Sequence, residues 1–122
     1  MRILVVEDDE KIGSLLERGL QEEEFEVGRG RDGEEALSMA LSQTYDLILL
    51  DYMLPKKSGP EVASALRTQG QQTPILMLTA RDAPEDIERC LTSGANGYVT
   101  KPFRFDDLLE QIQRLAEPPA LD

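Results

Sequence analysis

Four short apolar runs constrain the fold of this chain more than any other feature of its sequence. They cover residues 3–6, 47–50, 75–78 and, more weakly, 98–99. None of them alternates with polar residues, so each predicts a strand covered on both faces, as is typical of a parallel sheet between two layers of helices. A fifth candidate, residues 25–27, is more mixed in character and is expected at an edge of the sheet.

Between these runs, apolar residues recur at helical spacing in five segments, which predicts five amphipathic helices. Their apolar positions are, in chain order, Ile12, Leu15, Leu16, Gly19 and Leu20; Ala36, Leu37, Ala40 and Leu41; Val62, Ala65 and Leu66; Ile87, Cys90 and Leu91; and Leu108, Leu109, Ile112 and Leu115. A strand is therefore followed by a helix five times over. This order predicts an α/β fold with a doubly wound, five-stranded parallel sheet and right-handed crossovers.

Local signals at the helix ends agree with this division. Ser58 and Glu61 have the spacing of a capping box, which would open the third helix. Asp82, just before a proline, would open the fourth helix, and Gly94 would end it. Residues 117–122 contain two adjacent prolines and cannot continue a helix. We therefore expect one domain over residues 1–116, followed by the start of a linker or tail.

The composition excludes several classes of function. Acidic residues outnumber basic ones 24 to 13, and the net charge of −11 argues against this domain itself gripping nucleic acid or an anionic membrane. The chain has no histidine, which excludes histidine-based catalysis, histidine metal ligands and an internal phosphohistidine. Its single cysteine, Cys90, fits a reducing compartment. No apolar run approaches the ~20 residues of a membrane span and the N-terminus lacks a signal-peptide pattern, so we expect a cytoplasmic protein.

The residues that follow the predicted strands carry the chemistry, because ligands of an open parallel sheet bind at the carboxyl ends of its strands. Four of these ends carry polar groups: Glu7, Asp8, Asp9 and Glu10 after the first strand; Asp51 after the third; Thr79 and Arg81 after the fourth; and Lys101 after the fifth. Carboxylates crowded into one cleft repel each other unless a cation lies among them. Their hard oxygen ligands suit Mg²⁺.

Each of these residues also has a simpler interpretation. Asp8 or Asp9 alone would cap the first helix, and Asp51 would be an ordinary turn residue after a strand. Thr79 would be a hydroxyl at a helix entry, and Lys101 part of a surface turn. Because all of these groups follow strands at the same edge of the sheet, a joint role in phosphoryl transfer is favoured over four separate local roles. In this joint role, Asp51 acts as a nucleophile that forms an aspartyl phosphate beside Mg²⁺, and Lys101 and Thr79 face the phosphoryl oxygens.

In this order and spacing, the sequence resembles the receiver domain of bacterial two-component response regulators over essentially its whole length. The resemblance is carried by residues 3–9, 51–55, 78–81 and 94–103. It implies a flavodoxin-like fold with strand order 2-1-3-4-5. It also implies that Asp51 takes a phosphoryl group from a histidine of a sensor histidine kinase, which suits a chain without histidine. Such a protein is a phospho-accepting switch rather than an enzyme.

The resemblance also implies roles for individual residues at the metal site. Asp8, Asp51 and the Met53 carbonyl would bind Mg²⁺ directly, and Glu7 would act through a water molecule. Asp9 falls one position beyond this set.

Further roles follow from the same resemblance. Thr79 and Tyr98 match the switch pair, which remodels the face made by the fourth helix, fifth strand and fifth helix on phosphorylation. Met53 and Arg81 occupy positions that tune hydrolysis of the acyl phosphate. The peptide bond between Lys101 and Pro102 is expected to be cis.

The residues that would determine the output of such a receiver match the family less uniformly. The motifs are most similar to the OmpR/PhoB type, which carries a winged-helix DNA-binding domain and forms a homodimer through ion pairs on the switch face. The matching positions here are Ile87, Asn96, Gly97 and Gln111, which cannot form most of those pairs, although Asp107 and Arg114 remain. The homodimer is therefore left open, and Ile87 would either face a specific partner or pack in the core.

Other outputs and functions compete with transcription regulation through a DNA-binding effector domain. A single-domain or hybrid-protein receiver and a phosphate-independent adaptor are compatible with the sequence, although an adaptor would be expected to lose Asp51 or Lys101. A haloacid-dehalogenase-type phosphatase needs a carboxylate where Met53 stands. A flavodoxin-like electron carrier needs a phosphate-cradling loop after the first strand, and the acidic residues 7–10 would repel that anion.

Overall fold

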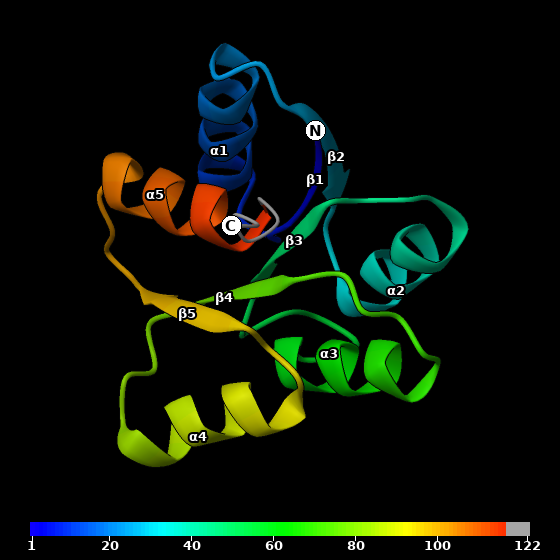
Figure 1. Ribbon diagram of the computed structural model, residues 1–122. Helices are drawn as coiled ribbons and strands as arrows, with labels where there is room; N and C mark the ends of the chain where they lie inside the picture. Colours follow the sequence, from blue (N-terminus) through cyan, green and yellow to red (C-terminus); the bar gives the residue numbers. More distant parts are fainter. Residues whose placement is uncertain (117–122) are drawn as a thin grey trace, which may run out of the picture.

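The computed structural model describes residues 1–116 and shows a five-stranded parallel sheet between two layers of helices (Figure 1). The strands are β1 (Arg2–Val6), β2 (Glu26–Gly30), β3 (Leu47–Asp51), β4 (Ile75–Thr79) and β5 (Gly97–Thr100). The helices are α1 (Glu10–Glu22), α2 (Gly33–Ser42), α3 (Gly59–Thr68), α4 (Pro84–Ser93) and α5 (Phe105–Ala116). The predicted linker at residues 117–122 lies outside the described residues.

The strand order is β2-β1-β3-β4-β5, as predicted, and every neighbouring pair is parallel. The three central strands are buried on both faces, apart from Arg2 at the start of β1. Their apolar side chains therefore supply two cores, one beneath α1 and α5 and the other beneath α2, α3 and α4 (Figure 1). No helix within the described part of the chain is both long enough and apolar enough to cross a membrane.

The two edge strands differ from the prediction. β5 is not covered on both faces, because it pairs only with β4 and its residues alternate between half-buried and exposed. β2 starts after Phe25 and continues beyond Val27 to Gly30, because β1 offers backbone pairing along that whole length. Glycine is required at position 28 because a Cβ there would lie 2.6 Å from the Tyr45 hydroxyl oxygen.

Three leucines of the predicted apolar stripes are exposed rather than buried. They are Leu15, Leu41 and Leu91, which are 67%, 39% and 46% exposed. Each lies at the border of its stripe, and a helix packed on a sheet buries only the residues that face the sheet. In α1, for example, Leu16 and Leu20 fill the core while Leu15 points away from it.

The helix ends confirm two of the three predicted signals. Ser58 and Glu61 form a complete capping box at α3, and Gly94 ends α4 with a φ of 120°. The prediction that Asp82 opens α4 is wrong, because the N-cap is Ala83 and no side chain caps this helix. A residue before proline prefers an extended backbone, so Ala83 becomes the last non-helical residue and Pro84 the first helical one.

A close approach between α3 and the end of β3 generates a prediction about stability. A Cβ at Gly59 would lie 2.5 Å from the Asp51 carbonyl oxygen and 2.7 Å from the Met77 sulfur. We expect Gly59→Ala to lower the free energy of unfolding by about 1–3 kcal/mol, because a packed core resists added volume. Urea denaturation measures this loss. Gly30→Ala is the matched control, since its Cβ would meet its neighbours at 3.6 Å or more. Equal losses in both variants would contradict the prediction.

Candidate functional site

The site lies at the carboxyl ends of the central strands, where the fold brings distant acidic residues together. β1 and β3 are neighbours in the sheet, so the residues that follow β1 lie beside Asp51 at the end of β3. One carboxylate oxygen each from Glu7, Asp8 and Asp51 lies within 4.8 Å of the other two. The structure thus assembles the three carboxylates that the sequence predicted to meet.

The buried polar side chains also lie at the carboxyl ends of the central strands. Within residues 1–116, the buried polar or charged side chains are Glu7, Asp51 and Thr79, with exposed fractions of 1%, 5% and 0%. All three follow or end central strands of the sheet. Removing a carboxylate from water is costly unless it is paired or bound to a cation. Both buried carboxylates of the described domain therefore lie where the sheet would bind a ligand.

Lys101 pairs with both buried carboxylates. Its ammonium Nζ lies 2.8 Å from Glu7 Oε1 and 3.2 Å from Asp51 Oδ2. The following peptide bond, to Pro102, is cis, as predicted. One ammonium faces two buried carboxylates, and Asp8 adds a third at the exposed rim, so the site carries excess negative charge.

The pKa values of the two partners reflect this crowding. Burial and the neighbouring Asp51 raise the pKa of Glu7, outweighing the opposite effect of Lys101. Burial by itself would lower the pKa of Lys101, but its contacts with Glu7 and Asp51 outweigh burial, so the pKa is raised. The ammonium therefore stays charged, while the carboxylates still lack enough positive charge to balance them.

The donor set fits a hard divalent cation. Glu7, Asp8 and Asp51 offer carboxylate oxygens and no sulfur or nitrogen, which suits Mg²⁺ rather than a softer metal. Asp9 is outside this set, as expected, because its Oδ1 caps α1 by accepting hydrogen bonds from the backbone N–H groups of Lys11 and Ile12. The simpler interpretation as a helix cap is thus correct for Asp9 and leaves Asp8 available.

Thr79 is bound to its own loop rather than to the carboxylates. Its hydroxyl donates to the Arg81 carbonyl at 3.1 Å and accepts from the Arg81 backbone N–H at 2.8 Å. Met53 is 58% exposed, and its backbone N–H lies 3.4 Å from Asp51 Oδ1. The metal-binding role of the Met53 carbonyl stays a prediction.

The Arg81 side chain lies along the rim of the site. Its guanidinium lies 3.5 Å from the Met53 sulfur, 3.4 Å from Asp86 of α4 and over the ring of Tyr52. The sequence analysis gave Arg81 and Met53 a shared role but did not predict the ion pair between Arg81 and Asp86. An acidic residue in the first turn of the following helix was the available signal.

The predicted output face shows one unexpected contact. Tyr98 is 40% exposed on the edge strand β5, and Ile87 is half-buried. The Asn96 side chain accepts hydrogen bonds from the Ile75 backbone N–H at 2.9 Å and from Arg67 at 3.0 Å. Asn96 therefore fastens the turn before β5 to the start of β4. Arg114 pairs within its own helix with Glu110.

Comparisons with known proteins agree with this geometry. A family model described as the response regulator receiver domain matches residues 3–113. The transcriptional regulatory protein PcoR of Escherichia coli is 42% identical over 114 residues, which are 93% of this chain and 50% of PcoR. This chain spans about half the length of the curated relatives it matches.

Solved receiver structures have the same fold. The receiver domain of the Francisella response regulator 1452 superimposes with a TM-score of 0.90 at 34% identity, covering 94% of this chain and 95% of that one. The receiver domain of the sensor histidine kinase PA1611 from Pseudomonas aeruginosa has a TM-score of 0.87 at 35% identity, covering 94% and 96%. The PA1611 structure has a magnesium ion coordinated in its active-site cleft.

The acidic cluster predicts how Mg²⁺ changes stability. We expect Mg²⁺ to raise the thermal unfolding midpoint of the wild type, because a cation that binds only the folded state stabilises it. Asp8→Asn should lose most of this increase and should be more stable than the wild type without Mg²⁺, since one repelling charge is gone. Calorimetry with and without Mg²⁺ measures both effects.

The neighbouring Asp9→Asn variant is the matched control. It removes the same charge one position along, and asparagine caps a helix about as well as aspartate does. The Mg²⁺-dependent increase should persist in this variant. Equal losses in the two variants would show that overall charge, rather than the cluster, controls the response.

Proposed function

The chain belongs to the response regulator receiver family, and from this premise we propose that Asp51 accepts a phosphoryl group from a sensor histidine kinase. The observation that carries this proposal is the burial of the Asp51 carboxylate at the end of the central strand β3, 3.2 Å from an ammonium group. A carboxylate in this position is a nucleophile held beside positive charge. The donor histidine lies outside residues 1–122, because none of these residues is a histidine.

In the proposed reaction, a carboxylate oxygen of Asp51 forms a bond to phosphorus as the bond from phosphorus to the donor nitrogen breaks. The electron pair of the broken bond stays on the imidazole nitrogen, so the donor leaves as a histidine. Lys101 offsets charge on the phosphoryl oxygens from its place between Glu7 and Asp51. A Mg²⁺ ion bound by Asp8, Asp51 and the Met53 carbonyl, with Glu7 nearby, would supply further charge stabilisation.

The proposed switch starts at Thr79. Its hydroxyl is bound to the backbone of Arg81, and turning it toward a phosphoryl group on Asp51 would break both hydrogen bonds. The loop released in this way leads into α4, whose first turn has no side-chain cap. A loop and helix end with few fixed contacts repack at little cost, and Tyr98 on β5 would change its packing with them.

We place the output in transcription regulation through a DNA-binding domain outside this chain. The support is that PcoR, of which this chain spans about half, is named as a transcriptional regulatory protein. A single-domain or hybrid-protein receiver is the second candidate, since the PA1611 receiver domain belongs to a sensor kinase. In either case the domain is a phospho-accepting switch that at most assists its own phosphorylation and dephosphorylation.

Intact mass spectrometry tests the acceptor directly. After incubation with acetyl phosphate and Mg²⁺, the wild type should gain the mass of one phosphoryl group, and it should gain none when Mg²⁺ is chelated. Asp51→Asn should gain none under either condition, because an amide is not an effective nucleophile. Labelling that survives in Asp51→Asn would mean that another residue is the acceptor.

The exposed Met53 side chain predicts a slowly hydrolysed acyl phosphate. A thioether cannot position an attacking water by hydrogen bonding as an amide can. We therefore expect Met53→Asn to shorten the lifetime of the phosphorylated state, about 3-fold or more, because even a modest change in barrier height alters a rate several-fold. Decay of the phosphorylated mass after removal of acetyl phosphate measures this lifetime.

Met53→Leu provides the control for this experiment. It keeps an apolar side chain of similar size and should leave the lifetime unchanged. Equal or slower decay in Met53→Asn than in the wild type would contradict the proposed role of Met53.

A further inference from the structure

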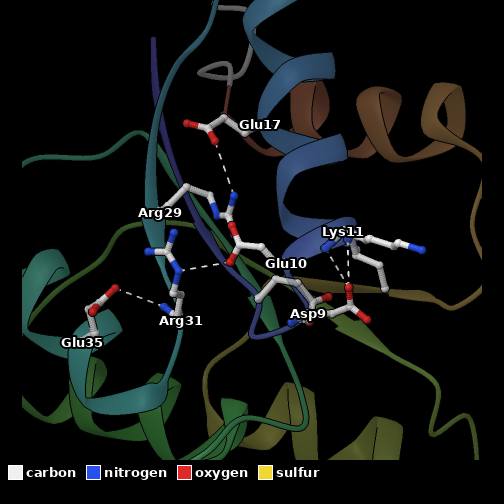
Figure 2. Close-up of polar contacts among 9 residues, drawn as sticks. Asp9, Glu10, Lys11, Glu17, Arg29, Arg31 and Glu35 are labelled. Carbon is white, nitrogen blue, oxygen red and sulfur yellow. Dashed lines mark hydrogen bonds and ion pairs between the residues drawn. The ribbon is translucent and has the colours of Figure 1, made fainter.

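The turn that carries Asp8 is held at both of its ends by the end of strand β2. The Glu7 backbone N–H donates to the Gly30 carbonyl at 3.1 Å. At the other end of the turn, the Glu10 carboxylate pairs with Arg31 Nε at 3.2 Å and with Arg29 Nη2 at 3.7 Å (Figure 2). We call residues 29–31 the β2 clamp. The exposed Asp8 lies between the two attached ends.

The Arg29 side chain is charged but nearly buried, which is unusual for a purely structural contact. It is only 9% exposed, and the guanidinium crosses α1 at Gly13, where any Cβ would overlap it. It forms ion pairs with Glu10 on one side and Glu17 on the other (Figure 2). Its Nε and Nη2 atoms nevertheless have no hydrogen-bond partner within the described residues.

A guanidinium buried in this way costs stability, and an apolar side chain would often fill the same space equally well or better. The charge supplies what an apolar side chain could not, ion pairs with Glu17 at 3.4 Å and with Glu10 at 3.7 Å. The pair with Glu10 is the one that reaches the turn carrying Asp8.

Arg31 attaches the same carboxylate to the other side of the fold. Its side chain is 55% exposed and reaches Glu10, while its backbone N–H donates to Glu35 in the first turn of α2 at 3.1 Å (Figure 2). Glu10 is therefore joined to β2 through Arg29 and, through Arg31, to the start of α2. Two cations at one carboxylate also offset part of the negative charge that accumulates over residues 7–10.

We propose that Arg29 and Arg31 are positioning residues for the divalent cation, acting through Glu10 to hold the turn that presents Asp8. This inference rests on the proposed function and deepens it. Without the clamp, repulsion among Glu7, Asp8 and Asp51 favours outward movement of the turn, because Asp8 is its exposed member. A ligand held in place binds a metal more tightly than one that must first be ordered.

The sign of the change in Mg²⁺ affinity separates positioning from simple electrostatics. Removing a positive charge near a cation site should tighten Mg²⁺ binding if only long-range Coulomb forces act. Loss of positioning should weaken it. Arg31→Met is the principal variant, because its exposed side chain can be replaced without opening the core. Arg29→Met tests the buried member, and Arg31→Lys, which keeps the charge, should restore part of the affinity.

Isothermal titration of the wild type and each variant with MgCl₂ measures the dissociation constant. We expect Arg31→Met to weaken binding about 3- to 10-fold, at the low end of the effects seen when groups behind metal ligands are removed. Lys56→Met is the matched control: Lys56 is an exposed cation that pairs with Asp32 and Glu34 rather than with the turn. Lys56→Met should leave the dissociation constant unchanged or slightly lower it.

The outcomes distinguish the two proposals. Unchanged or tighter binding in Arg31→Met, as in Lys56→Met, would overturn the β2 clamp while leaving the acceptor role of Asp51 intact. Absence of Mg²⁺ binding in the wild type would overturn the metal site, and the clamp with it. If Arg29→Met fails to fold, Arg31→Met still decides the question.

Discussion

The pairing of one ammonium with two buried carboxylates is the interaction on which the rest of this site depends. Glu7 follows β1, Asp51 ends β3 and Lys101 follows β5, so their contacts form only when these strands are assembled in one sheet. The three groups remain one positive charge short, and Asp8 at the rim increases the deficit. That deficit suits the folded domain to binding a cation. In the proposed function, a phosphoryl group on Asp51 would change the same balance of charge.

The surrounding fold supports this arrangement with rigid and less rigid parts. The strands β1, β3 and β4 are buried on both faces and fix where the carboxylates and Thr79 lie. The loop from Thr79 to α4 is held by few contacts, chiefly the two Arg81 backbone hydrogen bonds and the Arg81–Asp86 ion pair. A fixed site beside a loosely held loop is the combination that lets a local charge change become a shift between two packings.

Much of this was predictable from the sequence, for a physical reason. Strands buried on both faces must be continuously apolar, so β1, β3 and β4 could be predicted. With them came the carboxylates after β1 and at the end of β3, and Thr79 at the end of β4. Edge strands lack that constraint, which is why the extent of β2 and the exposure of β5 were wrong. The exposure of Leu15 shows that helical spacing alone overestimates how much of a helix surface is buried. The space that Gly13 leaves for the Arg29 guanidinium depends on α1 packing against β2, which no local pattern encodes.

A crystal structure with Mg²⁺ and beryllofluoride, which stands in for a phosphoryl group, tests the central claim most directly. The account predicts beryllium bound to an Asp51 carboxylate oxygen, the metal beside Asp8 and Asp51, and Lys101 on a fluorine. It also predicts that the Thr79 hydroxyl turns from the Arg81 backbone toward the fluorines. Beryllofluoride bound elsewhere, or an occupied Asp51 with Thr79 still bonded to Arg81, would contradict the account.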